Sequence, residues 1–292
     1  MSISRQNLSI IIVTFKSEEV IYECINSIDK DIKIIIIENS DNIKFKKKLE
    51  ATYNNVSCVL SHDNLGMGKA NNLGIKKTKT DFFLILNPDV ILEATTINEL
   101  ILASQKIPDF AILAPISSDI IYPNYQLDKN EKNIIKNTSP FKVKSVDGYA
   151  MLFNKKKLDK VIQEYYFDEN FFMYLENDDL CKRIIDVNEY IYVAPNSKIK
   201  HLGGKAVNNK YKNEVEFARN WHWIWSKFYF NKKHYGYLKA FLNGLPKFSS
   251  SMIRYIFYSL IQSKTKKKIY FNRMSGFFNA AINKRSWYRS QF

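Results

Sequence analysis

The chain has 292 residues, of which 46% are hydrophobic and 25% are charged, a composition typical of globular proteins rather than disordered ones. It carries 44 Lys and Arg residues against 29 Asp and Glu residues, which gives a formal net charge of +15. Its three cysteines, Cys24, Cys58 and Cys181, are widely spaced and odd in number, which excludes a disulfide framework and a CxxC metal site.

Short apolar runs alternate with helical patterns in the first third of the chain. The β-branched runs predict buried strands at residues 8–14, 32–38, 56–60 and 82–86. Helical spacing of apolar residues predicts helices at 18–28, 43–53 and 68–77. This alternation indicates βαβ crossovers and therefore an α/β protein with a mostly parallel sheet, in which ligands bind beyond the carboxyl ends of the strands.

The middle of the chain has a weaker pattern. Residues 119–144 are polar and rich in Asn and Lys, which predicts a long loop or flap. Beyond it we expect strands at 146–153 and 190–194, and helices at 155–162 and 176–187. After residue 204 we expect mainly helices.

The net charge is concentrated at the C-terminal end. Residues 205–292 hold 18 of the basic residues, only two acids (Glu214 and Glu216) and all four tryptophans, whereas residues 1–204 are almost neutral. We therefore expect a domain at 1–204 and a basic, aromatic helical region at 205–292. No signal peptide or membrane-spanning run is evident, so a cytoplasmic protein with at most peripheral membrane contact is expected.

Two segments of the first domain could handle a phosphorylated ligand. Asp89 follows the buried run that starts at Leu84, where a carboxylate can ligate a cation bound to a diphosphate or can simply form a turn. The glycine-rich segment 63–74 could direct backbone N–H groups and Lys69 at an anion. It could equally be an ordinary strand-to-helix turn in which Asn71 is a satisfied polar residue.

Two later segments carry candidate acid–base groups. Glu176 and Asp179 fall on one face of the predicted helix, directly after an aromatic run. Desolvation there can raise a carboxylate pKa toward the range of a general base, although acids in a first helical turn also complement the helix dipole. His201, which precedes two glycines, could close over a phosphate or a metal, or could be a structural residue.

In their order and spacing, these segments resemble the family 2 inverting glycosyltransferases, above all the bacterial rhamnosyltransferase-type enzymes of O-antigen and capsule biosynthesis. The resemblance covers residues 7–205 and rests on residues 9–14, 38–41, 64–72, 86–89, 146–152, 167–183 and 201. It implies a GT-A fold, in which helices flank a Rossmann-like, mostly parallel sheet, here with a mainly helical C-terminal extension. It also implies a nucleotide-sugar donor and Mg²⁺ or Mn²⁺.

The resemblance implies a donor site at the ends of the first strands. Thr14 and Phe15 would border the nucleotide, and Glu38 and Asp41 would lie near its base and ribose. Asn71 would support the same region, beside the anion-facing Lys69. Lys16 departs from the family pattern, which commonly has Asn after the first strand.

The resemblance also implies the reactive residues. Asn87 and Asp89 stand where the family has its metal-binding Asp-x-Asp motif, and His201 matches a histidine that contacts the metal or the diphosphate. Glu176 matches the catalytic base, with Asp179 as the next candidate. Because the family's Glu-Asp-x-Asp is Glu-Asn-Asp-Asp here, the amide of Asn177 leaves the identity of the base open.

These implications give the expected function. The enzyme would move a sugar, dTDP-rhamnose-like or from a UDP donor, to a saccharide or a polyprenyl-diphosphate-linked acceptor in cell-surface polysaccharide synthesis. The alternatives are a non-catalytic membrane-associated scaffold on a degenerate transferase, and a sugar nucleotidyltransferase.

The basic aromatic region 205–292 permits three interpretations. Its aromatic residues could form the core of a helical subdomain, and basic patches with aromatic residues could bind nucleic acid, although no nucleic-acid-binding module is visible. We expect the helical core to be part of the answer. We favour in addition contact with an anionic membrane, because aromatic rings suit the headgroup region and lysines are attracted to anionic lipid. The expected location is therefore peripheral, on the inner face of the cell membrane.

Overall fold

The computed structural model describes residues 3–119, 123–127, 138–162, 164–204 and 206–290. The chain forms two compact units. The sheet unit comprises Met1–Asp168 and Asn177–Asn208, and the helical unit comprises Glu169–Glu176 and Asn209–Phe292. The predicted division at residue 204 differs from these units in one respect, because the short segment 169–176 groups with the C-terminal helices.

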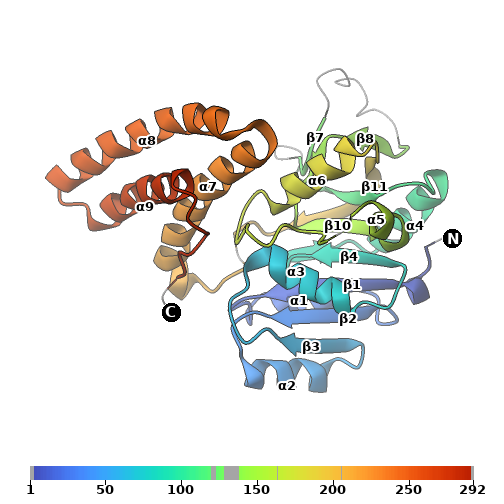
Figure 1. Ribbon diagram of the computed structural model, residues 1–292. Coiled ribbons are helices and arrows are strands. Elements are labelled where there is room, and N and C mark those ends of the chain that lie inside the picture. The colour runs from blue at the N-terminus through green and yellow to red at the C-terminus, as the bar shows by residue number, and fades with distance from the viewer. Residues whose placement is uncertain (1–2, 120–122, 128–137, 163, 205, 291–292) are drawn as a thin grey trace. The chain divides into compact units, whose positions relative to one another are not determined.

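The sheet unit is built on a mixed sheet with the strand order β3-β2-β1-β4-β10-β6-β11-β5, and β8 pairs with β11 (Figure 1). β1, β2, β3 and β4 pair in parallel, β10 is antiparallel to β4 and β6, and β11 is parallel to β6. The strands are β1 (Leu8–Thr14), β2 (Lys33–Glu38), β3 (Val56–Leu60), β4 (Phe82–Leu86), β5 (Val90–Leu92), β6 (Ile112–Ser117), β7 (Tyr125–Gln126), β8 (Phe141–Val143), β9 (Ser145–Val146), β10 (Ala150–Asn154) and β11 (Ile191–His201).

Helices cover both faces of this sheet. Short 3-10 turns at Arg5–Asn7 and Asn209–Tyr211 precede β1 and α7. One face packs against α1 (Ile21–Asn26), α2 (Ile43–Thr52) and α4 (Thr96–Lys106), and the other packs against α3 (Gly66–Lys77), α5 (Lys155–Val161) and α6 (Glu176–Asp186). The alternation along each strand explains this division, because Ile10 and Ile12 of β1 join the first core and Ile11 joins the second.

The structure confirms most predicted elements and corrects two. β1, β3 and β4 have the predicted bounds. The strand predicted at 146–153 is wrong, because the chain leaves β9 at Val146, which pairs with β7, and joins the main sheet only at Ala150. The strand predicted at 190–194 continues to His201, with a register shift between Ala194 and Lys198. Part of the predicted loop at 119–144 lies outside the described residues, and β7 and β8 lie in the rest.

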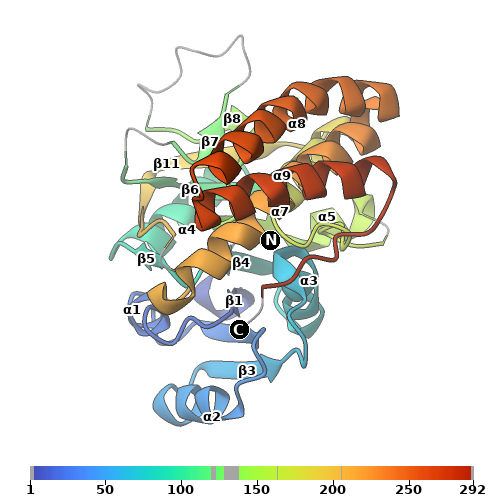
Figure 2. The same ribbon diagram turned by 90° about the vertical axis from the view of Figure 1, so that its left-hand side faces the viewer.

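The helical unit consists mainly of α7 (Lys212–Tyr235), α8 (Tyr237–Leu260) and α9 (Lys264–Ala281) (Figure 2). Trp221, Trp225 and Phe228 of α7 form its core with Phe277 of α9. Close packing requires Gly276, because a Cβ there would meet the carbonyl oxygen of Trp221 at 2.5 Å. The prediction that aromatic residues form a helical core is therefore confirmed. None of the helices in the described ranges is long and apolar enough to cross a membrane.

Candidate active site

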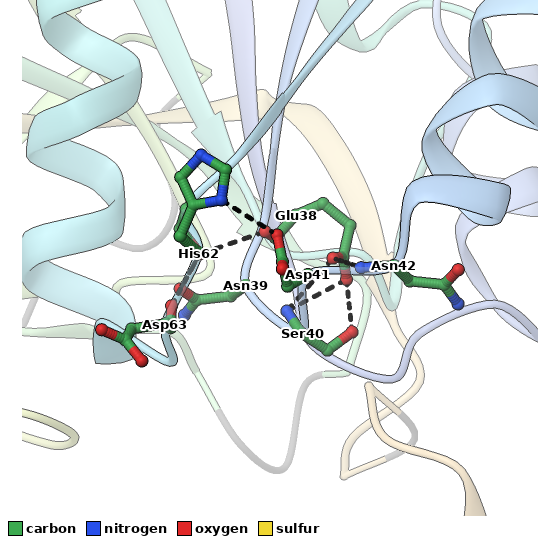
Figure 3. A network of polar contacts seen from close by, with 8 residues as sticks. Glu38, Asn39, Ser40, Asp41, Asn42, His62 and Asp63 are labelled. Carbon is green, nitrogen blue, oxygen red and sulfur yellow. Dashed lines mark hydrogen bonds and ion pairs between the residues drawn. The ribbon is translucent and has the colours of Figure 1, made fainter.

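The loop after β2 is organised by a buried carboxylate (Figure 3). Glu38, the last residue of β2, accepts hydrogen bonds from the backbone N–H groups of Ser40 (3.2 Å) and Asn42 (2.7 Å) and from the Ser40 hydroxyl. Asp41 adopts the left-handed conformation (φ 55°), and its carboxylate lies 3.3 Å from Nδ1 of the exposed His62. The predicted pair thus divides its roles: Glu38 shapes the loop, and Asp41 presents a carboxylate at the surface.

Asn39 joins this loop to the start of α3. Its amide donates to Oδ1 of Asn64 and to the carbonyl of Gly66, and its Oδ1 accepts from the backbone N–H of Leu65. Neither Asn39 nor His62 was predicted as a site residue, although Asn39 directly follows β2 and His62 is the second residue after β3. That position is itself the signal that could have identified them.

The paired amides on α3 have different surroundings. The side chain of Asn72 both donates to and accepts from the backbone of Phe167, at 2.8 and 3.0 Å. Asn71 is also buried, but its Oδ1 has no hydrogen-bond partner within the described structure. Lys69 lies exposed in the first turns of the same helix. Asn71 therefore keeps an acceptor available for a ligand, as its predicted role requires.

Thr14 and Phe15 lie at the carboxyl end of β1. Thr14 is fully buried, and its hydroxyl lies 3.5 Å from the carbonyl oxygen of Ile37. The backbone N–H of Phe15 donates to the Ser17 hydroxyl, and Lys16 between them is left-handed (φ 54°). The left-handed Lys16 in this turn stands at the position where the family pattern commonly has Asn.

Asn87 and Asp89 follow β4 and meet the end of β11. Asp89 is buried, and its Oδ1 lies 3.5 Å from Nε2 of His201, the last residue of β11. Oδ1 of Asn87 and Oδ1 of Asp89 are both buried without a hydrogen-bond partner in the described structure. Since buried polar atoms are normally paired, these two oxygens and the imidazole form a set of acceptors open to a ligand.

Three further residues lie around this set and were missed by the sequence analysis. The ring of Tyr149 stacks on His201 with centroids 4.0 Å apart. Burial raises the pKa of Asp147, and the nearby His201 opposes that shift. Burial and then the charge of Asp147 raise the pKa of Asp178 to about 6. The structure thus brings Asp147 and Asp178 together beside the residues predicted to handle the donor.

Asn177 explains how these two acids come together. Its amide donates to the carbonyl of Val146 at 2.9 Å. A Cβ added at Gly148 would lie only 3.2 Å from the Cβ of Asn177, so the two backbones approach closely. The first turn of α6 is thereby fixed against the segment between β9 and β10. The sequence signal was present, because Asp147 precedes Gly148 within a motif that the family resemblance already included.

Asp179 is already engaged in an ion pair. Its carboxylate is fully buried and accepts from Nε of Arg183 at 2.9 Å, while the same guanidinium binds the carbonyl groups of Tyr165 and Tyr166. This arrangement anchors the chain before α6. The role of Asp179 as second candidate base stays a prediction. In the structure its carboxylate holds the Arg183 guanidinium that binds the chain before α6.

Glu176 ends the short segment that belongs to the helical unit. In that segment Phe171 packs edge-on against Tyr229, and the carbonyl of Met173 accepts from the Ser226 hydroxyl at 2.8 Å. Tyr174 accepts from Nε of Arg219 at 2.7 Å, and the charge of Glu176 contributes to raising the pKa of Tyr174, after burial. Helix α7 therefore holds the residues that directly precede the predicted base.

The donor set of this arrangement can be compared with what a bound cation needs. Within the described ranges no group of three or more His, Cys, Asp and Glu side chains could hold a metal ion. The unpartnered oxygens of Asn87 and Asp89 and the imidazole of His201 nevertheless fit a hard cation whose other ligands come from a diphosphate.

Comparison with known families and proteins agrees with this geometry. The model of the family described as glycosyl transferase family 2 matches residues 9–162. The low-salt glycan biosynthesis hexosyltransferase Agl10 of Haloferax volcanii is 26% identical over 193 residues, covering 61% of each chain. Rhamnosyltransferase WbbL of Escherichia coli is 26% identical over 214 residues, covering 64% of this chain and 80% of WbbL. The chain thus matches less than two thirds of the length of Agl10.

Solved structures show the same fold at low sequence identity. The Pyrobaculum calidifontis mannosyltransferase PcManGT, in complex with GDP-Man and Mn²⁺, has a TM-score of 0.57 at 11% identity, with 97% of this chain and 89% of PcManGT covered. TarS residues 1–349 of S. aureus, in complex with UDP-GlcNAc, has a TM-score of 0.52 at 14% identity, with 97% and 93% covered. The predicted GT-A fold is confirmed.

Proposed function

Because the chain belongs to glycosyl transferase family 2, we propose that it transfers a sugar from a nucleoside-diphosphate donor to an acceptor hydroxyl with inversion at the anomeric carbon. The observation that carries this proposal is the set of unpartnered buried oxygens on Asn87 and Asp89 beside His201, at the carboxyl end of β4. A dTDP-rhamnose-like or UDP-linked sugar is the proposed donor, supported by the similarity to a rhamnosyltransferase and to a structure with UDP-GlcNAc.

The residues present fit a divalent cation, Mg²⁺ or Mn²⁺. Asp89 and His201 would hold it, with Asn87 as a further oxygen ligand. When bound, such a cation neutralises charge that develops on the departing diphosphate. Lys69 lies in the first turn of α3, where a positive charge and the helix N-terminus favour an anion, and Asn71 lies in the second turn.

The transfer needs a base for the acceptor. The acceptor oxygen forms a bond to the anomeric carbon, the bond from that carbon to the phosphate oxygen breaks, and the hydroxyl proton passes to a carboxylate. We propose Glu176 for this role on the strength of the family resemblance, with a contribution of ~10²–10⁴-fold. Asp179 remains the second candidate, and the structure adds Asp178 as a third, because its raised pKa of about 6 suits a base near neutral pH.

The proposed acceptor is a saccharide or a polyprenyl-diphosphate-linked saccharide of cell-surface polysaccharide synthesis, such as O-antigen or capsule. This proposal is supported by the similarity to Agl10, a hexosyltransferase of low-salt glycan biosynthesis, and to the rhamnosyltransferase WbbL. A lipid-linked acceptor places the enzyme at the cytoplasmic face of a membrane, in agreement with the basic C-terminal region.

A thermal-shift screen with UDP-, GDP- and dTDP-sugars, each with and without Mn²⁺, tests the donor and the metal together. A donor at 100 times its dissociation constant stabilises the native state by ~2.7 kcal/mol, so we expect a clear rise in Tm for one nucleotide class. Asp89→Asn should lose the Mn²⁺-dependent part of this rise, whereas Asp159→Asn, a surface carboxylate paired with Lys155, should keep it.

Release of nucleoside diphosphate from the stabilising donor then separates an enzyme from a scaffold. We expect slow donor hydrolysis by the wild-type protein and faster turnover when an acceptor is supplied. Donor binding without any hydrolysis or transfer favours the scaffold, and release of pyrophosphate from a sugar phosphate and a nucleoside triphosphate favours the nucleotidyltransferase. Absence of stabilisation by every donor contradicts the transferase proposal.

A further inference from the structure

Helix α8 exposes large apolar side chains along most of its length. It buries only Ala240 and Ser251, although its 24 residues are rich in Leu, Ile and Phe. Figures 1 and 2 show α8 beside α9 within the helical unit, so one side of α8 is covered and another is not. The exposed apolar residues of α8 are Tyr237, Leu238, Leu242, Leu245, Met252, Ile253, Ile256, Phe257 and Leu260.

These exposed residues share one face of the helix. Leu238, Leu242, Leu245, Met252, Ile256 and Leu260 follow one another at intervals of four, three, seven, four and four residues, the spacing of a single helical stripe. Two of them are among the most exposed apolar residues of the described chain, with Leu238 70% and Leu260 77% exposed. Scattered apolar residues are normal on a surface, but a continuous stripe indicates a partner.

Positive charge lies on the side of α8 that faces α7 and α9 and beyond the C-terminal end of the stripe. Residues 217–292 contain no Asp or Glu, and α8 itself carries Lys239, Lys247 and Arg254. A hydrogen bond with Lys227, followed by burial and by the charges of Lys227 and Arg273, lowers the pKa of Lys247 to about 8. Lys247 and Arg254 thus face α7 and α9 and do not flank the stripe, so the cations close to it are those that follow Leu260 at the start of α9.

The start of α9 carries charge that works against the helix itself. Lys264, Lys266, Lys267 and Lys268 occupy its first turn or directly follow it, and the first turn has no acid. Cations at a helix N-terminus oppose the helix dipole and so lower the stability of the helix. Lys268 pairs with Glu214 and Lys267 lies over the ring of Tyr255, whereas Lys264 and Lys266 are exposed just beyond the end of α8.

We propose that the face of α8 that carries Leu238, Leu242, Leu245, Ile256 and Leu260 inserts into the headgroup region of an anionic membrane. Lys264 and Lys266, which are exposed just beyond the C-terminal end of the stripe, would contact the lipid phosphates. An exposed apolar stripe with cations close by is a usual form of an interfacial membrane helix. Nucleic acid fits less well, because the stripe offers aliphatic side chains and not an aromatic platform for bases.

This inference rests on the membrane location given under the proposed function and names the surface that binds the membrane. It does not depend on the proposed transfer reaction. Flotation of the full-length protein with phosphatidylcholine vesicles, with and without 30% phosphatidylglycerol, measures membrane binding without donor or acceptor. We expect the protein to float with the anionic vesicles and to remain behind with the neutral ones. Donor-induced stabilisation is measured separately, so a failure of the enzymatic proposal is distinguishable from a failure of this one.

Two variants and one control test the surface. Ile253→Glu/Leu260→Glu places charge on the exposed apolar face, which should weaken flotation at least tenfold. Lys264→Gln/Lys266→Gln removes two lipid-facing charges worth ~1 kcal/mol each, which should weaken anionic binding by roughly tenfold or more. Leu102→Glu, at a similarly exposed apolar residue on α4 of the sheet unit, should behave as wild type.

Specific outcomes overturn the proposal. Wild-type protein that ignores anionic vesicles rejects it, and so does undiminished binding by the Ile253→Glu/Leu260→Glu protein. A dimer by light scattering that this variant dissociates, without vesicle binding, assigns the face to a second copy of the chain instead. Unchanged far-UV circular dichroism and an unchanged donor-induced rise in Tm confirm that each variant is folded.

Discussion

At the scale of single residues, the acids at the start of α6 are the most informative feature. The sequence identified Glu176 and Asp179, but the structure shows Asp179 in a buried ion pair and places Asp178 beside Asp147. The resemblance could indicate that a base lies in this segment. It could not indicate which acid meets Asp147, because that depends on how the turn between β9 and β10 approaches α6.

The raised pKa of Asp178 predicts that Asp178→Asn stabilises the protein while it impairs transfer. The native state binds the Asp178 proton more tightly than the unfolded state does, so the free energy of unfolding falls as the pH rises from about 4 through about 6. The full shift corresponds to ~3 kcal/mol, and partial exposure of the side chain reduces our expectation to about 1–2 kcal/mol at pH 8.

Urea unfolding at pH 4 and pH 8 measures this difference, which should be small at the lower pH and large at the higher one. Glu176→Gln serves as the matched comparison for activity. Loss of transfer in both variants indicates that both acids serve the reaction, whereas loss in one alone identifies the base. A variant at Asp178 that is less stable than wild type at pH 8 contradicts the assigned electrostatics.

At the scale of elements, the contact of α3 with β1 positions the donor site and depends on Gly74. A Cβ at Gly74 would lie 2.4 Å from Cγ2 of Ile11, which is far inside van der Waals contact. Alanine favours helices over glycine by up to ~1 kcal/mol, but overpacking costs ~1–3 kcal/mol. We expect Gly74→Ala to lower the free energy of unfolding, whereas Lys77→Ala at the exposed end of α3 should change it by less than ~0.5 kcal/mol. Urea midpoints measured at a common pH test this expectation. A lower midpoint for Gly74→Ala indicates overpacking against Ile11, and a higher midpoint indicates that helix propensity dominates.

The sequence pattern predicted an element correctly where one short run of residues is enough to determine its bounds. The bounds of β1, β3 and β4 follow from their β-branched runs between turn signals. The break after Val146 could not be predicted, because β9 pairs with β7, a strand about 20 residues earlier in the chain. The position of β10 between β4 and β6, antiparallel to both, could not be predicted either, because the sequence of one strand does not determine which strands pair with it.

At the scale of the whole molecule, one spectroscopic signal is specific to one unit. All four tryptophans lie in residues 205–292, so tryptophan emission reports the helical unit alone, whereas far-UV circular dichroism reports both units. We expect anionic vesicles to raise the denaturant midpoint seen by tryptophan emission, and donor with Mn²⁺ to raise the midpoint of the circular-dichroism transition that tryptophan emission does not report. Neutral vesicles and free nucleoside are the controls. A single coincident transition that both ligands shift equally would show that the units unfold as one.

The three cysteines give the protein a further experimental property. Cys24, Cys58 and Cys181 are all buried, and burial raises the pKa of each thiol, to about 12 for Cys58 and Cys181. Thiolates react and thiols do not, so maleimide reagents should leave the native protein unlabelled. A single cysteine introduced at the exposed Ser250 of α8 would then carry the only fluorophore or spin label, and the depth of that helix in a bilayer could be read from an otherwise unmodified enzyme.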